Sequence, residues 1–516
     1  MEQVVITTIV LVFAIVLFVW NKLPVGIVAI GTALSLYFTG VLDAEQALAG
    51  FGDPVIVFIA ALFVVSEGLD ATGITTWAGQ RLLDLSGGKP RRLTIFVMVL
   101  VALVTALISV NGAVAALLPM VVILAIRSGQ PASHMLMPLA FGAHAGSLLV
   151  MTGSPVNVLV SEYAQDATGR GIGFFEFGVI GVPVVLATIL VIATLGPRLL
   201  PTRIPRVAPR DLSRHAPTLA RQYSLDATLI DRERGVSELV VAPRSAFVGE
   251  TVFTGMATDS GDLVILAIQR SGEDLTRTVL AAGDVLLLQG SWEALDEHLS
   301  DPSLLVVDAP AALRRQAGSL GRKAKMVLVI LTGMVVLLAT GVVPAAVAAL
   351  LAAAAMVALR VLSVTEAHRS ISWTTLILVG GMIPLSTAIQ VSGAADLVAQ
   401  ALAGTIGDSS PYLLLLGISL VTVILGQLIS NMATALIVAP IAVSLAAETG
   451  ISPLPLLLAV SVCSAAAFLT PVATPANTMV MGPGAYHFGD YWKLGLPLLL
   501  VFVAASTFLV PVFWHF

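Results

Sequence analysis

The sequence predicts a polytopic α-helical membrane protein built from two inverted halves, with a small α+β domain inserted between them. Three observations lead to this fold class: recurring apolar segments of membrane-spanning length, a low charge density, and an internal repeat of glycine, proline and asparagine. Of the 516 residues, 57% are hydrophobic and 11% are charged, and the mean hydropathy is +0.98. A soluble chain carries roughly twice that charged fraction, so we expect most of these segments to lie in a bilayer.

Ten apolar segments have the length of about 20 residues that a transmembrane helix needs. We predict spans at 4–20, 23–41, 54–70, 134–161 and 173–197, and again at 326–342, 344–360, 374–391, 454–484 and 491–512. Two further apolar segments, 93–126 and 411–446, are each interrupted near the middle by an asparagine, Asn111 and Asn431. Each could form two ordinary spans, but a re-entrant hairpin that enters and leaves on one side fits the interruption better.

The distribution of basic residues supports the hairpins and predicts the orientation. With two hairpins, each half crosses the membrane five times, and nine basic residues of the short loops share one side with the polar stretch 198–325: Lys22, Arg81, Lys89, Arg91, Arg92, Arg127, Arg360, Arg369 and Lys493. The opposite side receives only Arg170. Loops rich in Lys and Arg stay in the cytoplasm. We therefore expect a multi-pass protein of the plasma (inner) membrane, with both termini outside the cytoplasm and the inserted domain cytoplasmic.

The two halves match at a fixed offset of 320 residues. The matched pairs are Pro24 with Pro344, Ala47 with Ala367, Gly73 with Gly393, Asn111 with Asn431, Pro155 with Pro475, and Asn157 with Asn477. Registered glycine, proline and asparagine are informative because each marks unusual backbone. Five crossings is an odd number, so the second half must be inserted upside down relative to the first. Inverted repeats of this kind are typical of secondary transporters, which bind substrate near the midplane between the halves.

Composition also excludes several functions. The net charge of −5 provides no large basic surface, so we predict no nucleic-acid partner. The single cysteine, Cys463, lies in an apolar segment, which rules out an internal disulfide framework and indicates a small buried residue. We find no metal-spaced His/Glu cluster, Ser/His/Asp set or Gly-rich phosphate loop near the membrane segments. The sequence therefore predicts no enzymatic activity and no cofactor.

Two polar motifs in each half interrupt the apolar segments. One is the hairpin break, at 109–112 and 429–434, and the other lies in the following long span, at 152–157 and 472–477. Proline leaves the carbonyl one turn back without its donor, and irregular backbone at membrane depth survives only inside protein or beside a water-filled cavity. Freed carbonyls can coordinate Na⁺, and helix N-termini attract anions. The alternative is that these motifs are kinked helices whose Asn and Ser side chains hold neighbouring helices together.

Carboxylates are missing from these regions. No Asp or Glu occurs between Asp84 and Glu162, and only Glu448 occurs between Asp408 and Asp490. A carrier that exchanges protons on a buried carboxylate would place one there, whereas an uncharged polar site suits an anion neutralised by dipoles and bound cations. His144 could take a proton or contact an anion, although we interpret it first as a neutral core histidine.

The second half resembles the divalent anion/sodium symporter family. The resemblance rests on 430–435, Ser-Asn-Met-Ala-Thr-Ala, and on 467–477, which contains Pro-Val-Ala-Thr-Pro-Ala-Asn. It implies an elevator-type homodimer that carries a dicarboxylate, citrate or sulfate together with Na⁺. The substrate-binding residues that it implies are Asn111, Gly112, Ser154, Pro155, Ser430, Asn431, Met432, Thr474 and Pro475. The implied Na⁺ candidates are Asn111, Gly153, Asn431 and Ala473.

Both hairpin tips depart from the Ser-Asn-Thr pattern of that family. The first tip reads Val110-Asn111-Gly112, and the second has Met432 in place of threonine. Two hydroxyl groups that would contact an anion are therefore replaced, as is a serine that would help to hold a cation. Substrate identity and Na⁺ stoichiometry stay open. An arsenite or cation/proton carrier of the same superfamily is the alternative, whereas a closed midplane site argues against a channel.

The chain divides into five predicted parts: a first transmembrane repeat (1–197), a linker (198–232), a cytoplasmic domain (233–305), a linker (306–325) and a second transmembrane repeat (326–516). The inserted domain shows β-patterned runs at 237–241, 263–268 and 284–289 and an amphipathic helix at 292–299. Its residues 248–251, 264–270 and 283–290 resemble the C-terminal domain of TrkA-type potassium-uptake regulators. We interpret it either as the receptor of a small regulatory ligand or as a packing or dimerising module.

The charge asymmetry generates a prediction about topology. A cysteine introduced near either terminus should react with a membrane-impermeant reagent in intact cells, because both ends are predicted to lie outside the cytoplasm. A cysteine introduced near Asp284 should react only after permeabilisation. Labelling of both termini only in permeabilised cells would contradict the five-crossing arrangement.

Overall fold

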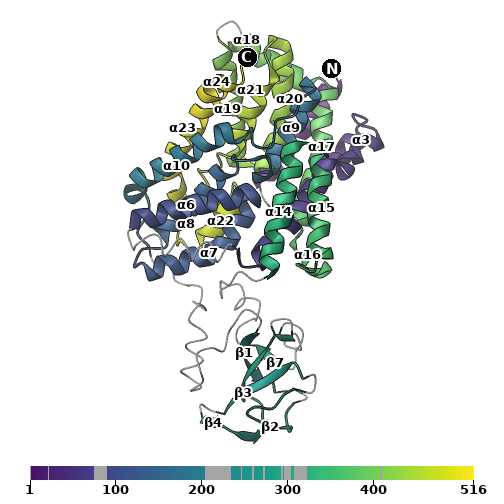
Figure 1. The fold of residues 1–516 in the computed structure, drawn as a ribbon. Helices are drawn as coiled ribbons and strands as arrows, with labels where there is room; N and C mark the ends of the chain where they lie inside the picture. Colours follow the sequence, from purple (N-terminus) through teal and green to yellow (C-terminus); the bar gives the residue numbers. More distant parts are fainter. Residues whose placement is uncertain are drawn as a thin grey trace. The chain divides into compact units, whose positions relative to one another are not determined.

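A computed structural model describes most of the chain in two compact units (Figure 1). The described residues are 2–20, 22–74, 90–203, 234–243, 245, 247–258, 261–270, 273–291, 294–295, 304–306, 322–406 and 410–516. The helical unit comprises Met1–Gly68, Arg81–Ala208 and Val327–Phe516, and the second unit comprises Leu69–Gln80 and Pro209–Met326.

The first half of the helical unit contains a hairpin and an interrupted helix. Its helices are α1 (Glu2–Trp20), α2 (Val25–Phe38), α3 (Ala44–Ala49), α4 (Pro54–Ala71), α6 (Pro90–Leu107), α7 (Val110–Arg127), α8 (Ser133–Gly146), α9 (Pro155–Thr168) and α10 (Gly178–Leu199). Helices α6 and α7 form the hairpin, and α8 and α9 are the two pieces of the predicted span 134–161.

The second half repeats this order of elements. Its helices are α14 (Arg322–Thr340), α15 (Ala345–Ala358), α16 (Val364–Ser370), α17 (Trp373–Val391), α18 (Ala394–Ile406), α19 (Pro411–Leu428), α20 (Asn431–Thr449), α21 (Pro453–Ser464), α22 (Pro475–Met481), α23 (Tyr491–Ala504) and α24 (Val510–Phe513). Helices α19 and α20 form the second hairpin, and α21 and α22 are the pieces of the second interrupted helix. A π-helical turn, η5 (Ala505–Leu509), joins α23 to α24.

Equivalent helices start with equivalent signals, which confirms the internal repeat. Pro24 precedes α2 and Pro344 precedes α15, each in an extended conformation that ends the preceding connection. Asp43 begins α3 and Ser363 begins α16 with a capping box, in which the side chain accepts a backbone N–H three residues later. The two pairs are 320 residues apart, as the sequence predicted.

Several elements differ from the predicted spans. Helices α2 and α15 have 14 residues each, so at 1.5 Å per residue they extend about 21 Å, which is less than the roughly 30 Å hydrocarbon core. The short helices α3 and α16, and the amphipathic α18 after the third span of the second half, were not predicted. They lack a long apolar run, because they connect spans instead of crossing the membrane.

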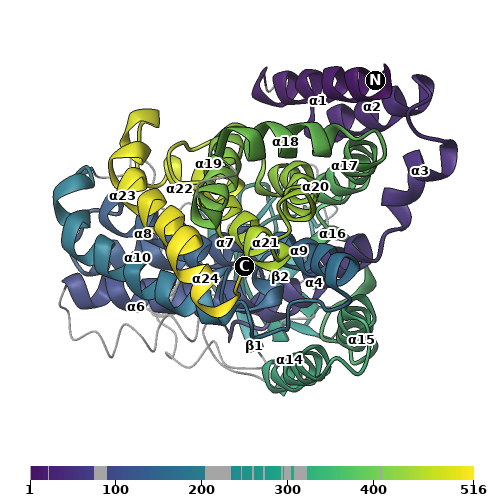
Figure 2. The ribbon, with the colours of Figure 1, turned by 90° about the horizontal axis from the view of Figure 1, so that it is seen from above.

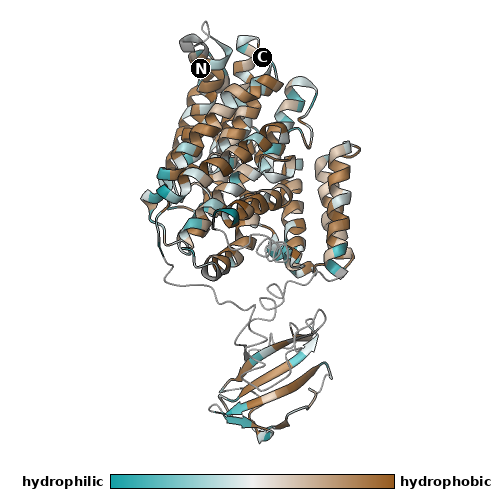
Figure 3. Cartoon of the chain, turned by 60° about the vertical axis from the view of Figure 1, so that its left-hand side comes forward, coloured by the Kyte–Doolittle hydropathy of each residue, from teal (hydrophilic) through white to brown (hydrophobic). Residues whose placement is uncertain are grey.

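The outer surface of the helical unit is apolar. Among the described residues, eight helices are long and apolar enough to cross a membrane. On α1, Ile9 and Phe13 are each 61% exposed, and Figure 3 shows hydrophobic residues along most of the helices. Apolar side chains exposed over so many helices fit contact with lipid acyl chains better than contact with water. The chain is therefore a multi-pass membrane protein.

The two halves interlock through their interrupted helices. Helix α9 of the first half packs against α20 and α21 of the second, and α22 of the second half packs against α7 and α8 of the first. Helices α10 and α23 also lie side by side (Figure 2). This reciprocal packing places both hairpin tips and both helix breaks in one region. Cys463 on α21 is buried, as predicted, with Sγ 3.3 Å from Ser506 Oγ.

The second unit is built around an antiparallel sheet. Its strands are β1 (Arg234–Val241), β2 (Thr251–Phe253), β3 (Leu263–Arg270), β4 (Glu273–Leu275), β5 (Arg277–Val279), β6 (Val285–Ser291) and β7 (Leu304–Val306). The five-stranded sheet has the order β4-β3-β6-β1-β7, and β2 pairs with β5. Strands β1, β3 and β6 confirm the three predicted β runs. Of the predicted helix 292–299, only residues 294–295 are described, and they are helical.

One side of this sheet covers a small core that includes Leu239, Ile265 and Leu288. At one edge, the guanidinium of Arg270 donates to both carboxylate oxygens of Asp284 at 2.7 Å. Asp284 also accepts the backbone N–H of Ala281 at 2.8 Å. The hydrogen bonds from Arg270 hold the pKa of the Asp284 carboxyl below its usual value. The predicted linkers, 204–232 and 307–321 in particular, lie outside the described residues.

Asp284 should make the stability of this domain depend on pH. The lowered pKa in the folded state means that its contribution is complete above the unfolded pKa, near 4, and is lost as pH falls through the folded value. We expect Asp284→Asn to lower the melting temperature of a 233–305 fragment clearly at pH 7 and less at pH 3. Glu273→Gln, an equal charge change at an exposed position, is the control. An equal loss at both pH values would contradict this role.

Candidate functional site

A serine that caps the following helix sets the geometry of each hairpin tip. Ser109 precedes α7, and its Oγ accepts the backbone N–H of Gly112 at 3.3 Å. Ser430 precedes α20, and its Oγ accepts the backbone N–H of Ala433 at 3.3 Å. Such N-caps satisfy one of the free donors at the start of a helix. They leave the remaining N–H groups of the first turn, and the asparagine next to them, at the tip.

The second piece of each interrupted helix also begins with a side-chain cap and a proline. Ser154 Oγ accepts the N–H of Val156 at 3.2 Å, and Thr474 Oγ1 accepts the N–H of Asn477 at 3.4 Å. Proline suits the first helical position because its missing N–H would have no intrahelical partner there. The breaks are therefore specified locally by the sequence.

One buried asparagine in each half fixes the backbone of the helix break, from the first turn of the helix that follows the break. Each donates both amide hydrogens to two carbonyls of the break that it follows: Asn157 to Ser147 and Val150 at 2.8 and 3.0 Å, and Asn477 to Ala467 and Thr470 at 2.7 and 3.1 Å. These carbonyls lost their helical donors when the helix ended. The asparagines replace those donors, which explains why they repeat at an offset of 320 residues.

The two hairpin tips differ in one contact. Asn111 Oδ1 accepts the backbone N–H of Ala476, at the start of α22 in the other half, at 3.2 Å. The equivalent oxygen of Asn431 is buried and has no hydrogen-bond partner in the described part of the chain. The same holds for Thr434 Oγ1, one turn later on α20, and for Thr470 Oγ1 in the break between α21 and α22. Buried polar groups usually have a hydrogen-bond partner, so these three oxygens of the second half stand out because no described group satisfies them.

Tips and breaks of both halves line a single cavity of about 800 Å³. One wall is apolar and comes from α1, α2 and α4, including Phe18, Val25 and Phe63. None of the described residues that line the cavity is Asp, Glu, Lys or Arg. The hairpin tips and helix breaks contribute hydroxyl and amide groups and the start of helices α7, α9, α20 and α22 to the lining. The cavity is thus uncharged but polar where the interrupted helices meet.

Nearly all of the residues that the sequence singled out lie on this cavity. Those lining it are Asn111, Gly153, Ser154, Pro155, Ser430, Asn431, Met432, Ala473, Thr474 and Pro475. Gly112 does not line it, because its α-carbon faces the side chains of Ile108 and Ser66, which a Cβ there would meet at 2.7 and 3.0 Å. Gly153 sits so close to the carbonyl of Ser147 that a Cβ would lie 2.4 Å from its oxygen, so a larger residue would displace the break.

The structure adds lining residues that sequence reasoning missed. Thr374 and Thr375 on α17 and Thr478 on α22 contribute hydroxyl groups to the cavity. The two threonines of α17 belong to no repeated motif, and only the packing of α17 brings them here. Thr478 lies one turn after Thr474, so the predicted start of α22 could have suggested it.

His144 joins the two halves at the edge of the cavity. Its imidazole is buried, with Nε2 3.1 Å from the hydroxyl of Thr474, and its ring lies edge-on to Phe468. Nδ1 is buried without a hydrogen-bond partner in the described part of the chain. The histidine is therefore both a core residue and a lining residue, and it positions the side chain that caps α22.

This arrangement defines a class of protein. Two interlocked helical repeats with hairpins and interrupted helices around one cavity are the architecture of a secondary membrane transporter. The sequence profile of the citrate transporter family, CitMHS, matches residues 15–450 and 406–516, and the chain belongs to this family. A crystal structure of the YdaH transporter of Alcanivorax borkumensis has the same fold, with a TM-score of 0.52 and 16% identity over 97% of this chain and 98% of that one.

Several related proteins are named as transporters. An uncharacterized transporter of Escherichia coli, YfbS, is 27% identical over 98% of both chains. The sodium-dependent dicarboxylate transporter SdcS of Staphylococcus saprophyticus is 31% identical over 28% of this chain and 29% of its own. A probable sodium/sulfate cotransporter of Chlamydomonas reinhardtii is 26% identical over 54% of this chain and 32% of its own. These relatives confirm the superfamily that the motifs predicted. All three are named as transporters and none as an enzyme, in agreement with the prediction from the sequence. The TrkA-type resemblance of the inserted domain stays a prediction.

The asparagines of the breaks give a testable order of stabilities. Asn157→Ala removes two donated bonds and one bond accepted from the Ser461 hydroxyl at 2.7 Å, whereas Asn477→Ala removes two donated bonds. Each buried group left unpaired costs about 1–3 kcal/mol. We expect melting temperatures in detergent to fall most for Asn157→Ala, less for Asn477→Ala and least for Ser461→Ala. A melting temperature of Asn157→Ala equal to that of the wild type would refute this positioning role.

Proposed function

We propose that this protein is a secondary active transporter that couples Na⁺ to the symport of a small divalent anion, such as a dicarboxylate or sulfate. The observation that supports this most directly is the uncharged cavity at which two hairpin tips and two helix breaks meet. Helix N-termini attract anions through their free N–H groups and their dipoles. The names of the sodium-dependent relatives point to the same pair of solutes.

The Na⁺ site of this proposal lies in the second half. Asn431 Oδ1, Thr434 Oγ1 and Thr470 Oγ1 are buried oxygens that receive no hydrogen bond from any described group, and oxygen is the ligand that hard cations prefer. The carbonyl of Ala473, which is three residues after Thr470, is a further candidate ligand. In the first half, Asn111 Oδ1 is already engaged by a backbone N–H, so we assign Asn111 and Gly153 a weaker part in cation binding. Na⁺ acts as a coupling ion, not as a resident cofactor.

An elevator-type movement fits the two kinds of wall. The polar wall consists of hairpins and interrupted helices that interlock with each other. The lining residues from α1, α2 and α4 are apolar. An apolar surface offers no hydrogen-bond partners that would have to be exchanged as the polar body moves along it. The proposal also includes a homodimer that is held together by the part of each protomer that does not move. In it, the inserted domain lies in the cytoplasm and regulates transport.

The alternative is a proton-coupled or arsenite carrier of the same superfamily. The lack of a carboxylate among the described lining residues disfavours proton exchange. His144 is the one titratable side chain among them, so it is the residue through which proton coupling would act. Replacing Na⁺ by K⁺ at constant pH separates the two mechanisms, because only Na⁺ symport requires Na⁺ for anion binding.

A thermal-shift screen tests the proposed function. A ligand that binds only the folded state raises the melting temperature by mass action. We expect sulfate or a C4-dicarboxylate to stabilise the purified protein in Na⁺ but not in K⁺. Asn431→Ala and Thr474→Ala should weaken anion binding by about 1–3 kcal/mol, the cost of an unpaired buried group, with the Na⁺ dependence altered most in Asn431→Ala.

Controls separate loss of binding from loss of folding. Thr194→Ala, at an exposed position on α10, is the matched control for Thr474→Ala and should bind normally. Asn111→Ala should lose both anion affinity and stability, because its oxygen also holds the start of α22. Wild-type uptake by Asn111→Ala and Asn431→Ala would show that these asparagines only join helices.

A further inference from the structure

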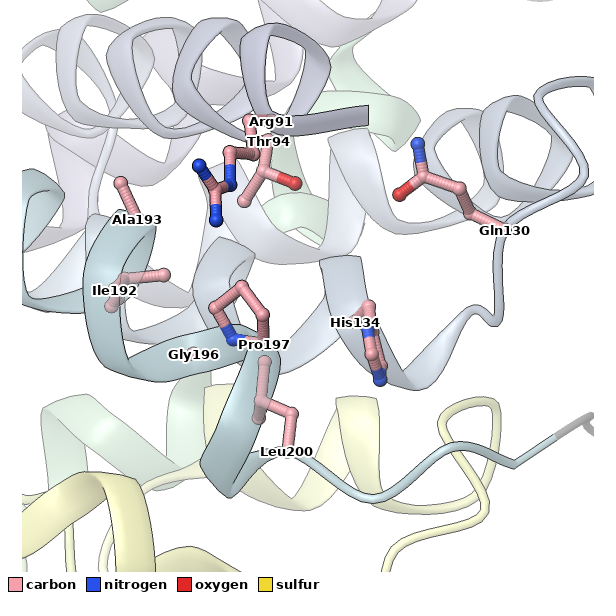
Figure 4. A pocket seen from close by; sticks show the side chains of 9 residues that line it. All are labelled: Arg91, Thr94, Gln130, His134, Ile192, Ala193, Gly196, Pro197 and Leu200. Atoms are coloured by element: carbon pink, nitrogen blue, oxygen red, sulfur yellow. The ribbon is translucent and has the colours of Figure 1, made fainter. Parts of the chain in front are cut away.

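A second, smaller pocket lies in the first half of the helical unit and shares no lining residue with the cavity. Its volume is about 220 Å³. Figure 4 shows Arg91 and Thr94 from the start of α6 on one side, Gln130 and His134 on another, and the last turns of α10 forming the rest. The α10 residues are Ile192, Ala193, Gly196 and Pro197, and Leu200 follows the end of the helix. Three membrane helices therefore enclose a pocket with one polar and one apolar side.

The polar side carries donors that the described chain does not use. Arg91 is exposed and makes no ion pair or hydrogen bond with a described residue. The amide Nε2 of Gln130 is buried and also finds no acceptor in the described ranges. His134 contacts the hydroxyl of Thr202 through Nε2 at 3.3 Å. None of the described lining residues is acidic, so an anion would meet a guanidinium and a buried amide donor without a competing carboxylate.

The apolar side continues onto the surface that faces lipid. On α10, Leu186 and Leu190 are 61% and 65% exposed, and they precede Ile192, the first lining residue of this helix, by six and two residues. Ala193 and Gly196 are small, which leaves space along the helix. An apolar chain attached to an anion in the pocket could therefore lie against α10 without leaving the hydrocarbon.

We propose that this pocket binds the headgroup of an anionic phospholipid, with the phosphate at Arg91 and Gln130 and an acyl chain along α10. Basic pockets between membrane helices recognise anionic headgroups in this way. The volume is below the roughly 300–1,000 Å³ of sites that enclose a whole small molecule, so only a headgroup would be enclosed. A free phosphate would match the donors but would leave the apolar wall unused. Because α10 packs on α8, bound lipid stabilises the first interrupted helix.

The test measures lipid-dependent stability of the full chain in neutral detergent. Phosphatidylglycerol should raise the melting temperature more than phosphatidylcholine does, and inorganic phosphate should not reproduce the difference. Arg91→Gln should weaken the apparent affinity for phosphatidylglycerol about fivefold, since one basic residue near an anionic lipid contributes about 1 kcal/mol. Arg92→Gln is the matched control: it removes the same charge at the next, exposed position, which does not line the pocket.

A second variant tests the apolar side and covers the case in which Arg91→Gln fails to fold. Gly196→Leu should fit without displacing the backbone, because a Cβ there meets Ile192 and Leu200 at the ordinary contact distances of 3.5 and 3.6 Å. Its side chain should fill the pocket and so reduce the phosphatidylglycerol effect. Equal losses in the Arg91 and Arg92 variants would overturn the proposal in favour of general surface charge. An equal shift with inorganic phosphate would replace the lipid by a soluble anion. Equal stabilisation by phosphatidylglycerol and phosphatidylcholine would show that the pocket is not a site for anionic lipid.

Discussion

The site depends on hydrogen bonding to backbone carbonyls where two membrane helices are interrupted. A broken helix inside an apolar protein leaves carbonyl groups that cannot turn to water, and each costs free energy unless a donor reaches it. Asn157 and Asn477 supply two donors each from the first turn after the break. Without them the irregular segments before α9 and α22 would have no fixed path. Because the segments are fixed, the helices restart at the cavity and not elsewhere.

The interlocking of the halves follows from where these helices restart. Helix α22 begins against α7, so that the N–H of Ala476 meets the tip asparagine of the other half. The reciprocal contact is not formed, since the N–H of Val156 is taken by Ser154 and Asn431 Oδ1 receives no hydrogen bond from the described part of the chain. His144 has no counterpart either, because Ser464 occupies the equivalent position. A repeat that is symmetric in its backbone is thus asymmetric in its free polar atoms, and the two tips can serve different solutes.

Local signals explain which features the sequence could predict. Proline, glycine and asparagine act on their own backbone, so the hairpins, the breaks, the repeat and nearly all lining residues of the tips could be located from Asn111, Ser154, Asn431 and Thr474. The contact between Asn111 and Ala476 depends on which helix of the other half packs there, which no local pattern records. The same is true of Thr374 and Thr375. Gly112 was predicted from its place in a motif, although the tip turns its α-carbon toward Ile108 and away from the cavity.

Under the proposed function, the lack of charged side chains in the cavity explains by electrostatics why anion binding is coupled to Na⁺ binding. A divalent anion entering a site whose described lining holds no lysine or arginine relies mainly on helix N-termini and on amide, hydroxyl and imidazole donors, and these carry at most partial charges when the imidazole is neutral. A cation held by Asn431 and the neighbouring threonines would supply the missing positive charge at short range. Each solute then raises the affinity for the other by the same factor, because binding linkage is reciprocal. A lysine or arginine in the cavity would bind the anion alone and abolish this dependence, which is a physical reason for Na⁺ symport to use a site without one.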